Sequence, residues 1–150
     1  FAIAAGAVAV AAALVLVIRA RPGQPESGTR TKGGPILGFF VGHGGDVRQG
    51  GVGERLVPGD QLQLFTTAIE PGWLAVTSVD GVGVHSVYVA PRAIEAGREQ
   101  LVPLSIVLDG TLGPETVTAI FCPRPFAIVA GAEPPPGCTI DRFTFVKVAP

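Results

Sequence analysis

The chain begins with eighteen residues, from Phe1 to Ile18, that include no charged side chain and none more polar than glycine. Arg19 and Arg21 follow almost directly. At a rise of about 1.5 Å per residue, a helix of this length measures about 27 Å, close to the ~30 Å hydrocarbon core of a bilayer. We therefore expect residues 1–20 to form one transmembrane helix, so that Phe1 to Ile18 contact the membrane and tether the rest of the chain.

A cleaved signal peptide is the alternative, because secretory signals are also apolar and end at a small-x-small triplet. Such a triplet occurs at Ala7 to Ala9, but the bulkiest part of the run, Leu14 to Ile18, comes after it. A peptidase site is expected at the end of the apolar run, so the order favours a retained anchor. Because the first residue is Phe rather than Met, we also expect part of the protein to precede it.

Residues 21–35 are rich in Pro, Gly, Ser and Thr and show no apolar periodicity, which predicts a flexible stalk. Four basic residues, Arg19, Arg21, Arg30 and Lys32, follow the anchor. The positive-inside rule would place this flank in the cytoplasm. The rule compares both flanks of a segment, and the other flank precedes Phe1, so the orientation stays open at this point.

The remaining residues, 33–150, are enough for one soluble domain with a core. They contain seven Arg or Lys and eleven Asp or Glu, which gives a net charge of −4. Nucleic acid would be repelled by this charge, and the basic residues are scattered singly instead of forming a stripe. Composition therefore excludes nucleic acid as a partner of this domain.

The domain is predicted to be mainly β, because no segment shows a helical stripe whereas several alternate with period two between turn signals. Turns are expected at residues 42–46, 58–60 and 108–110, and the Asp80-Gly81 pair predicts a hairpin. Residues 91–97 are expected to form a loop or a single helical turn. The predicted strands are residues 36–41, 47–49, 61–67, 73–79, 84–89, 100–104, 116–122 and 140–148.

Strands at this spacing are typical of an antiparallel β-sandwich, which we expect over residues 36–150. The strand at 116–122 alternates most strongly and is predicted to be central. Alternation places each of three groups on one face of its strand: Leu62 with Leu64, Val117 with Ala119 and Phe121, and Phe143 with Phe145. Four aromatic residues are expected in the core, although they could instead line a binding face: Trp73, Tyr88, Phe39 and Phe40.

Cys122 and Cys138 are the only cysteines and enclose a proline-rich loop that cannot hydrogen-bond itself together. A disulfide between them would stabilise the fold by about 3 kcal/mol in the loop-entropy model and would indicate an oxidising compartment. The even number of cysteines and their position at the two ends of this loop favour the disulfide. The alternative is a buried Cys122 on its strand and a free thiol at Cys138.

Other candidate chemistry is weakly supported. His43 and His85 together with the two cysteines offer two Cys and two His, but no two of them have the close spacing of a zinc ligand pair. A hydrolase could be assembled from Cys122 or Ser86 with His85 and Asp80 or Asp109, but no nucleophile elbow or paired-carboxylate motif positions them. We therefore expect no catalytic residue, no metal site and no cofactor.

Several motifs resemble a bacterial domain of unknown function that occurs at the C-terminus of anti-sigma-factor-like and ActD-like membrane proteins, after a single transmembrane helix. The similarity covers nearly all of residues 31–147. The segments that carry it are Thr-Lys-Gly-Gly at 31–34, residues 39–48, Val-Pro-Gly-Asp-Gln-Leu-Gln-Leu at 57–64, residues 74–88, residues 95–103, and Leu-Asp-Gly-Thr-Leu-Gly-Pro-Glu with Phe-Cys-Pro-Arg-Pro-Phe at 108–126.

The resemblance implies that a cytoplasmic anti-sigma domain of the zinc-finger type precedes the anchor and that the domain after it is periplasmic. This location agrees with the disulfide and disagrees with the basic flank; we favour the periplasm because one flank is weak support. The chain departs from the family's pattern at residues 127–136, which form a short, proline-rich segment where the family commonly has a longer helical segment. The family has no established catalytic residues to transfer.

The expected function is therefore that of a sensor or binding domain in a single-pass bacterial inner-membrane protein, with signalling assigned to a preceding cytoplasmic region. Its partner would be a protein or a small ligand of unknown identity. The alternative is a structural or accessory subunit of a membrane assembly, whose anchor packs through a small-residue face formed by Ala2, Gly6 and Ala9 or Ala13. An enzyme is the least supported class.

Overall fold

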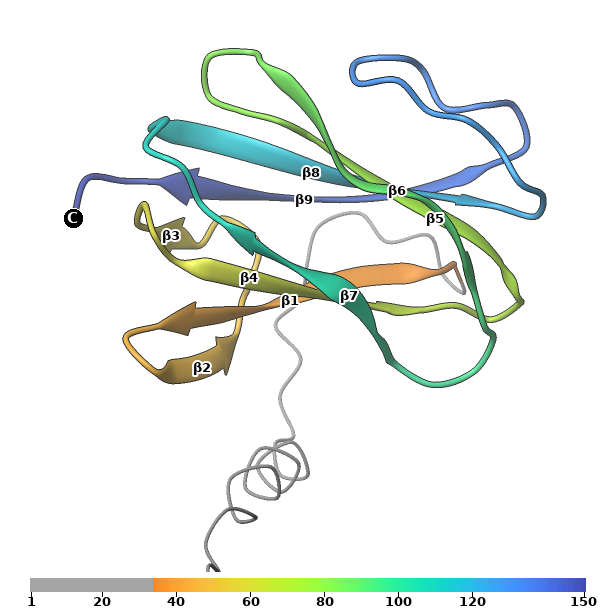
Figure 1. Ribbon diagram of the computed structural model, residues 1–150, viewed down its shortest axis with the longest axis horizontal. Helices are drawn as coiled ribbons and strands as arrows, with labels where there is room; N and C mark the ends of the chain where they lie inside the picture. The colour runs from red at the N-terminus through yellow and green to blue at the C-terminus, as the bar shows by residue number, and fades with distance from the viewer. Residues whose placement is uncertain (1–33) are drawn as a thin grey trace, which may run out of the picture.

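The computed structural model describes residues 34–150, which form nine strands in two sheets and include no helix (Figure 1). No membrane-spanning helix is found among these residues. The predicted transmembrane helix and almost all of the predicted stalk lie outside the described residues. The strands are β1 (Ile36–His43), β2 (Asp46–Gln49), β3 (Arg55–Leu56), β4 (Gln61–Thr67), β5 (Gly72–Val79), β6 (His85–Ile94), β7 (Gln100–Val107), β8 (Gly113–Cys122) and β9 (Thr139–Lys147).

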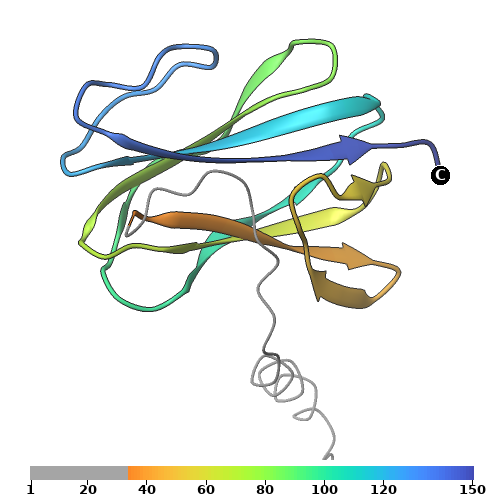
Figure 2. The same cartoon turned by 180° about the vertical axis from the view of Figure 1, so that it is seen from behind.

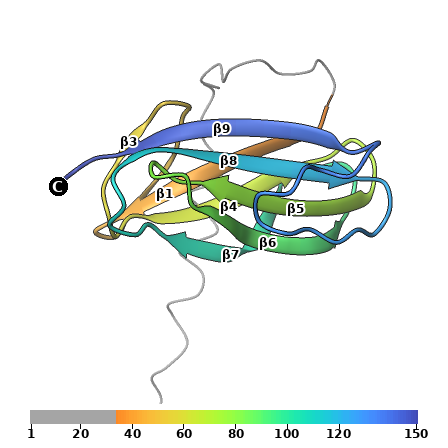
Figure 3. The same cartoon turned by 90° about the horizontal axis from the view of Figure 1, so that it is seen from above.

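The two sheets lie face to face, as the views from behind and from above show (Figure 2, Figure 3). One sheet has the order β2-β1-β4-β7 and the other has the order β3-β9-β8-β5-β6. Neighbouring strands are antiparallel throughout, except that the two-residue β3 runs parallel to β9. The predicted central strand is β8, the third of five, so its position is confirmed.

The core between the sheets is built from the alternating faces that the sequence predicts. Leu62 and Leu64 of β4 are fully buried in it. The ring of Phe39 from β1 stacks on that of Phe143 from β9, with centroids 4.6 Å apart. The opposing sheet contributes a further apolar set: Leu74, Val76, Val117, Ala119, Phe121 and Phe145. Burial of these side chains is the main force that holds the sheets together.

Aromatic residues also occupy the outer face of the four-stranded sheet. Phe40 and Phe65 pack there with centroids 5.0 Å apart. Gly38 lies beneath the ring of Phe65, where an added Cβ would be 2.2 Å from Cζ, so only glycine fits this position. Of the four aromatics predicted to be core, Phe39 is buried and Tyr88 packs against the core, whereas Phe40 and Trp73 are only half-buried.

The predicted loop at residues 91–97 is wrong in its first half, because β6 continues through Pro91 as far as Ile94. β6 is the last strand of its sheet, and a proline without an N–H is tolerated on such an edge. The same explanation applies to Pro103 in β7, the edge strand of the other sheet, which extends to Val107 instead of ending at residue 104. The short β3 was not predicted.

The loop at residues 123–138 lies across the outer face of the five-stranded sheet, over β5 and β6 (Figure 3). Ala75 and Ile120 point to this outer face and are nevertheless buried. Gly131 in the loop approaches the ring of His85, whose Cγ would be 3.2 Å from an added Cβ. The loop therefore forms a partial third layer, and it contains no helix.

Candidate functional site

The two ends of the domain have different characters. Residues 34–35, the β4–β5 turn, the β6–β7 turn and both ends of the loop at 123–138 lie at the proximal end, defined as the end that contains Gly34 (Figure 1). The opposite end, here called the distal end, consists of the turns at residues 43–46, 57–60, 80–84 and 108–112 and also contains the C-terminus. Most of the buried polar chemistry of the described residues lies at the distal end.

A chain of polar side chains crosses the five-stranded sheet at the distal end. The ammonium of Lys147 on β9 lies 2.5 Å from Oδ1 of Asp109 and 2.9 Å from Oε2 of Glu115. The second contact lacks the angles of a hydrogen bond and is an ion pair. The hydroxyl of Tyr88 on β6 donates a hydrogen bond to Oε1 of Glu115 on β8. We call these four residues the Lys147 network.

Burial differs sharply within the Lys147 network. The side chains of Lys147 and Glu115 are only 2% and 1% exposed, whereas that of Asp109 is 65% exposed. A buried charge that loses its partner is left with a large desolvation penalty. The network therefore joins a buried ion pair to a surface turn, and the position of Asp109 depends on a residue of the last strand.

The environment shifts three pKa values in the Lys147 network. Burial opposes the charge on Lys147, but its contacts with Asp109 and Glu115 outweigh burial and raise its pKa. Burial, together with the carboxylate of Glu115, raises the pKa of Tyr88. The ammonium of Lys147 lowers the pKa of Asp109. At neutral pH the network thus holds an ammonium, the Asp109 carboxylate and a neutral phenol.

A second polar pair lies at the same end. Nδ1 of His43, the last residue of β1, is 2.5 Å from Oδ1 of Asp60. The other oxygen of Asp60 accepts a hydrogen bond from the amide of Val57 at 3.0 Å, which closes the turn at 57–60. Asp60 is buried while His43 is largely exposed. The sequence predicted this turn but did not connect it to His43.

Backbone contacts join the distal turns into one continuous surface. The amide of Leu108 donates to the carbonyl of Asp60, and the amide of Gly59 donates to the carbonyl of Leu108, each at 2.9 Å. The turn at 108–112 in turn contacts the β5–β6 hairpin, where an added Cβ on Gly81 would lie 2.5 Å from the carbonyl oxygen of Leu112. The distal surface therefore spans both sheets.

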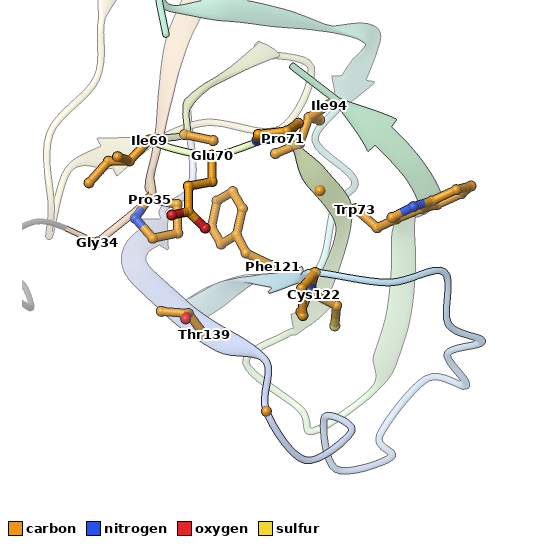
Figure 4. A pocket seen from close by; sticks show the side chains of 14 residues that line it. Gly34, Pro35, Ile69, Glu70, Pro71, Trp73, Ile94, Phe121, Cys122 and Thr139 are labelled. Carbon is orange, nitrogen blue, oxygen red and sulfur yellow. The ribbon is translucent and has the colours of Figure 1, made fainter. Parts of the chain in front are cut away.

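The proximal end contains an open depression of about 460 Å³. Apolar side chains dominate its wall, and the carboxylate of Glu70 points toward Pro35 and the ring of Phe121, whereas Trp73 lies at the opposite rim (Figure 4). Cys122 and Gly137 place the disulfide-closed loop along one side. The shape and lining suit a shallow contact with a ligand more than enclosure of a substrate.

The predicted disulfide is present. Cys122 at the end of β8 is bonded to Cys138, with the sulfur atoms 2.03 Å apart, and no free cysteine remains in the described part of the chain. The bridge ties together the two ends of the loop at 123–138 just before β9 begins. The alternative of a free thiol at Cys138 is thereby overturned.

The residues considered for metal or hydrolytic chemistry are not brought together. The two cysteines are bonded to each other, and His43 pairs with Asp60 at the opposite end of the domain. Within residues 34–150, no three His, Cys, Asp or Glu side chains form a metal-binding group. Asp80 accepts hydrogen bonds from two amides of its own hairpin, and Asp109 pairs with Lys147, so neither orients His85.

The Lys147 network was missed, although the sequence contains a signal for it. Continuing the inward face of Val117, Ala119 and Phe121 by one step places Glu115 in the core, and continuing that of Phe143 and Phe145 places Lys147 there. Two opposite charges at inward positions of adjacent strands indicate an ion pair.

No family model matches the chain, and neither does any curated protein or solved structure.

Proposed function

We propose that the protein is a single-pass bacterial inner-membrane protein whose β-sandwich, residues 36–150, lies in the periplasm and acts by recognition instead of catalysis. The Cys122–Cys138 disulfide is the observation that carries the proposal, because such bonds persist in oxidising compartments. The uncharged run from Phe1 to Ile18 serves as the membrane anchor, and residues 21–35 serve as a flexible stalk that holds the domain away from the bilayer.

A binding role is supported by how the domain presents its turns. Loops held on a rigid scaffold are where recognition residues concentrate. At the distal end, the carboxylates of Asp60 and Asp80 accept hydrogen bonds from backbone amides of their own turns, and backbone hydrogen bonds add to them. The turns are therefore fixed in place, so little conformational entropy is lost on binding. At the proximal end, the disulfide fixes the loop beside the depression.

The resemblance to the C-terminal domains of anti-sigma-factor-like proteins supports a signalling role for the region before Phe1. The coding sequence upstream of Phe1 separates this role from that of an accessory subunit. A cytoplasmic segment with Cys and His at zinc-ligand spacing would support signalling. An initiator Met directly before the anchor would favour the accessory subunit, which would pack through Ala2, Gly6 and Ala9 or Ala13.

The periplasmic location is tested by labelling the full chain with a membrane-impermeant maleimide. A variant with Cys122→Ala and Cys138→Ala receives one new thiol, Val129→Cys, in an exposed position of the loop at 123–138. We expect labelling in intact spheroplasts to equal that after lysis. A buried control, Val117→Cys, should label in neither sample unless the protein is unfolded. Labelling of Val129→Cys only after lysis would place the domain in the cytoplasm and end the proposal.

A further inference from the structure

Three exposed aliphatic side chains lie on two neighbouring turns at the distal end. Val82 and Val84 of the β5–β6 hairpin are 72% and 56% exposed, and Leu112 of the β7–β8 turn is 47% exposed. The contact of Gly81 with Leu112 and Gly113 holds the two turns together. We call these three side chains the distal apolar patch; the two turns that carry them lie at the ends of the strands opposite Gly34 (Figure 1).

The turn that carries the two valines is rigidly held. Oδ1 of Asp80 accepts hydrogen bonds from the amides of Val82 and Val84 at 3.0 and 2.8 Å. The amide of Asp80 also donates to the carbonyl of Val84 at 3.1 Å. A fixed turn presents its side chains at a lower entropic cost than a loose loop does. The distal apolar patch is therefore organised before any partner arrives.

The surroundings of the distal apolar patch are acidic. Each of the four distal turns contains one aspartate and no lysine or arginine; Asp80 and Asp109 belong to the two turns that form the patch, whereas Asp60 is buried and does not belong to the rim. Lys147 is buried and paired with two carboxylates, and the exposed Arg55 lies on β3, at the edge of the five-stranded sheet opposite β6. The patch is thus an apolar surface with a negative rim.

The charge of the rim selects among possible occupants. A second copy would bring the same aspartates against each other, and an anionic lipid surface would also be repelled. A segment that has apolar side chains flanked by lysine or arginine complements both the patch and its rim. We propose that the distal apolar patch binds a basic, amphipathic segment of a partner protein. This inference rests on the proposed recognition function and gives it a partner of defined chemistry.

The test uses the full chain in discs of zwitterionic phosphatidylcholine and a fluorescent synthetic peptide of alternating leucine and lysine blocks. Binding is followed by fluorescence anisotropy, and empty discs are subtracted. We expect Val82→Ser, Val84→Ser and Leu112→Ser together to weaken binding at least about tenfold, a loss of about 1.4 kcal/mol. Val129→Ser, an equally exposed valine in the loop at 123–138 and outside the two turns that form the patch, should leave binding unchanged.

Charge is tested separately with Asp80→Asn, which removes the negative charge and keeps an oxygen to accept the two turn amides. We expect it to weaken binding several-fold and to reduce the dependence of binding on salt. Glu133→Gln in the loop at 123–138 is the matched control. Circular dichroism of each variant checks that the fold is retained.

Three results would overturn the inference. The first is equal binding of the peptide to the triple variant and to the Val129→Ser control. The second is equal binding of a peptide in which glutamate replaces lysine. The third is a concentration-dependent dimer that the triple variant abolishes, which would make a second copy the occupant. None of these results bears on the side of the membrane, so failure here is distinguishable from failure of the proposed location.

Discussion

Replacing Lys147 tests whether the Lys147 network holds the distal end together. Lys147→Met keeps the length of the side chain but removes the ammonium, so that Glu115, which is 1% exposed, keeps only the hydroxyl of Tyr88 as a partner. Breaking a buried ion pair from one side costs about 3–5 kcal/mol. The contact with the largely exposed Asp109 adds about 0–1 kcal/mol.

We therefore expect Lys147→Met to lower the free energy of unfolding by about 3 kcal/mol or more. Urea denaturation of the full chain, followed by circular dichroism and by Trp73 fluorescence, measures this loss. For a slope of about 1.5 kcal/mol per molar urea, the midpoint falls by about 2 M. Arg142→Met, on the exposed face of the same strand, is the matched control and should change stability by less than about 0.5 kcal/mol.

A double variant separates the cost of the orphaned carboxylate from the value of the pair. Lys147→Met combined with Glu115→Gln removes both charges, and we expect it to recover much of the loss because no buried charge then lacks a partner. The reasoning would be refuted if Lys147→Met cost less than about 1 kcal/mol. It would also be refuted if the double variant were less stable than the single one.

Two further predictions concern pH and the disulfide. In the folded state, the pKa values of Lys147 and Tyr88 are raised above their ordinary 10.5 and 10.0. The stability that these two groups contribute is therefore present at neutral pH and is lost as the pH rises above about 10. We expect the urea midpoint to fall between pH 7 and pH 11, and we expect Tyr88→Phe to make this fall shallower. The lowered pKa of Asp109 predicts the opposite dependence of stability on pH in acid: stability is lost as the pH falls below the ordinary pKa of 3.8. For the Cys122–Cys138 bridge, which closes a loop with a sequence separation of 16, loop entropy predicts that Cys122→Ala with Cys138→Ala lowers the free energy of unfolding by about 3 kcal/mol. An unchanged urea midpoint on reduction of the unmodified chain would contradict that expectation.

The positions of the strands were predictable because a strand's side-chain alternation is a local property. Residues 61–67 and 116–122 alternate in the sequence and form β4 and the C-terminal part of β8. The Asp80-Gly81 hairpin was likewise predictable, since turn residues act on their own backbone. Pro91 misled the prediction, because a proline breaks an inner strand but is tolerated on an edge, and only the assembled sheet shows which strands are edges.

The sequence alone determined the mainly β class of the fold and the pairing of its two cysteines. Each of these depends on residue type and short-range spacing. Tertiary structure decided which charges meet: Asp109 with Lys147 across 38 residues, and His43 with Asp60 across 17. It also brought the hairpin of Val82 against the turn of Leu112. Such pairings depend on strand order and sheet packing, which no local pattern specifies, because many orders bury the same alternating faces.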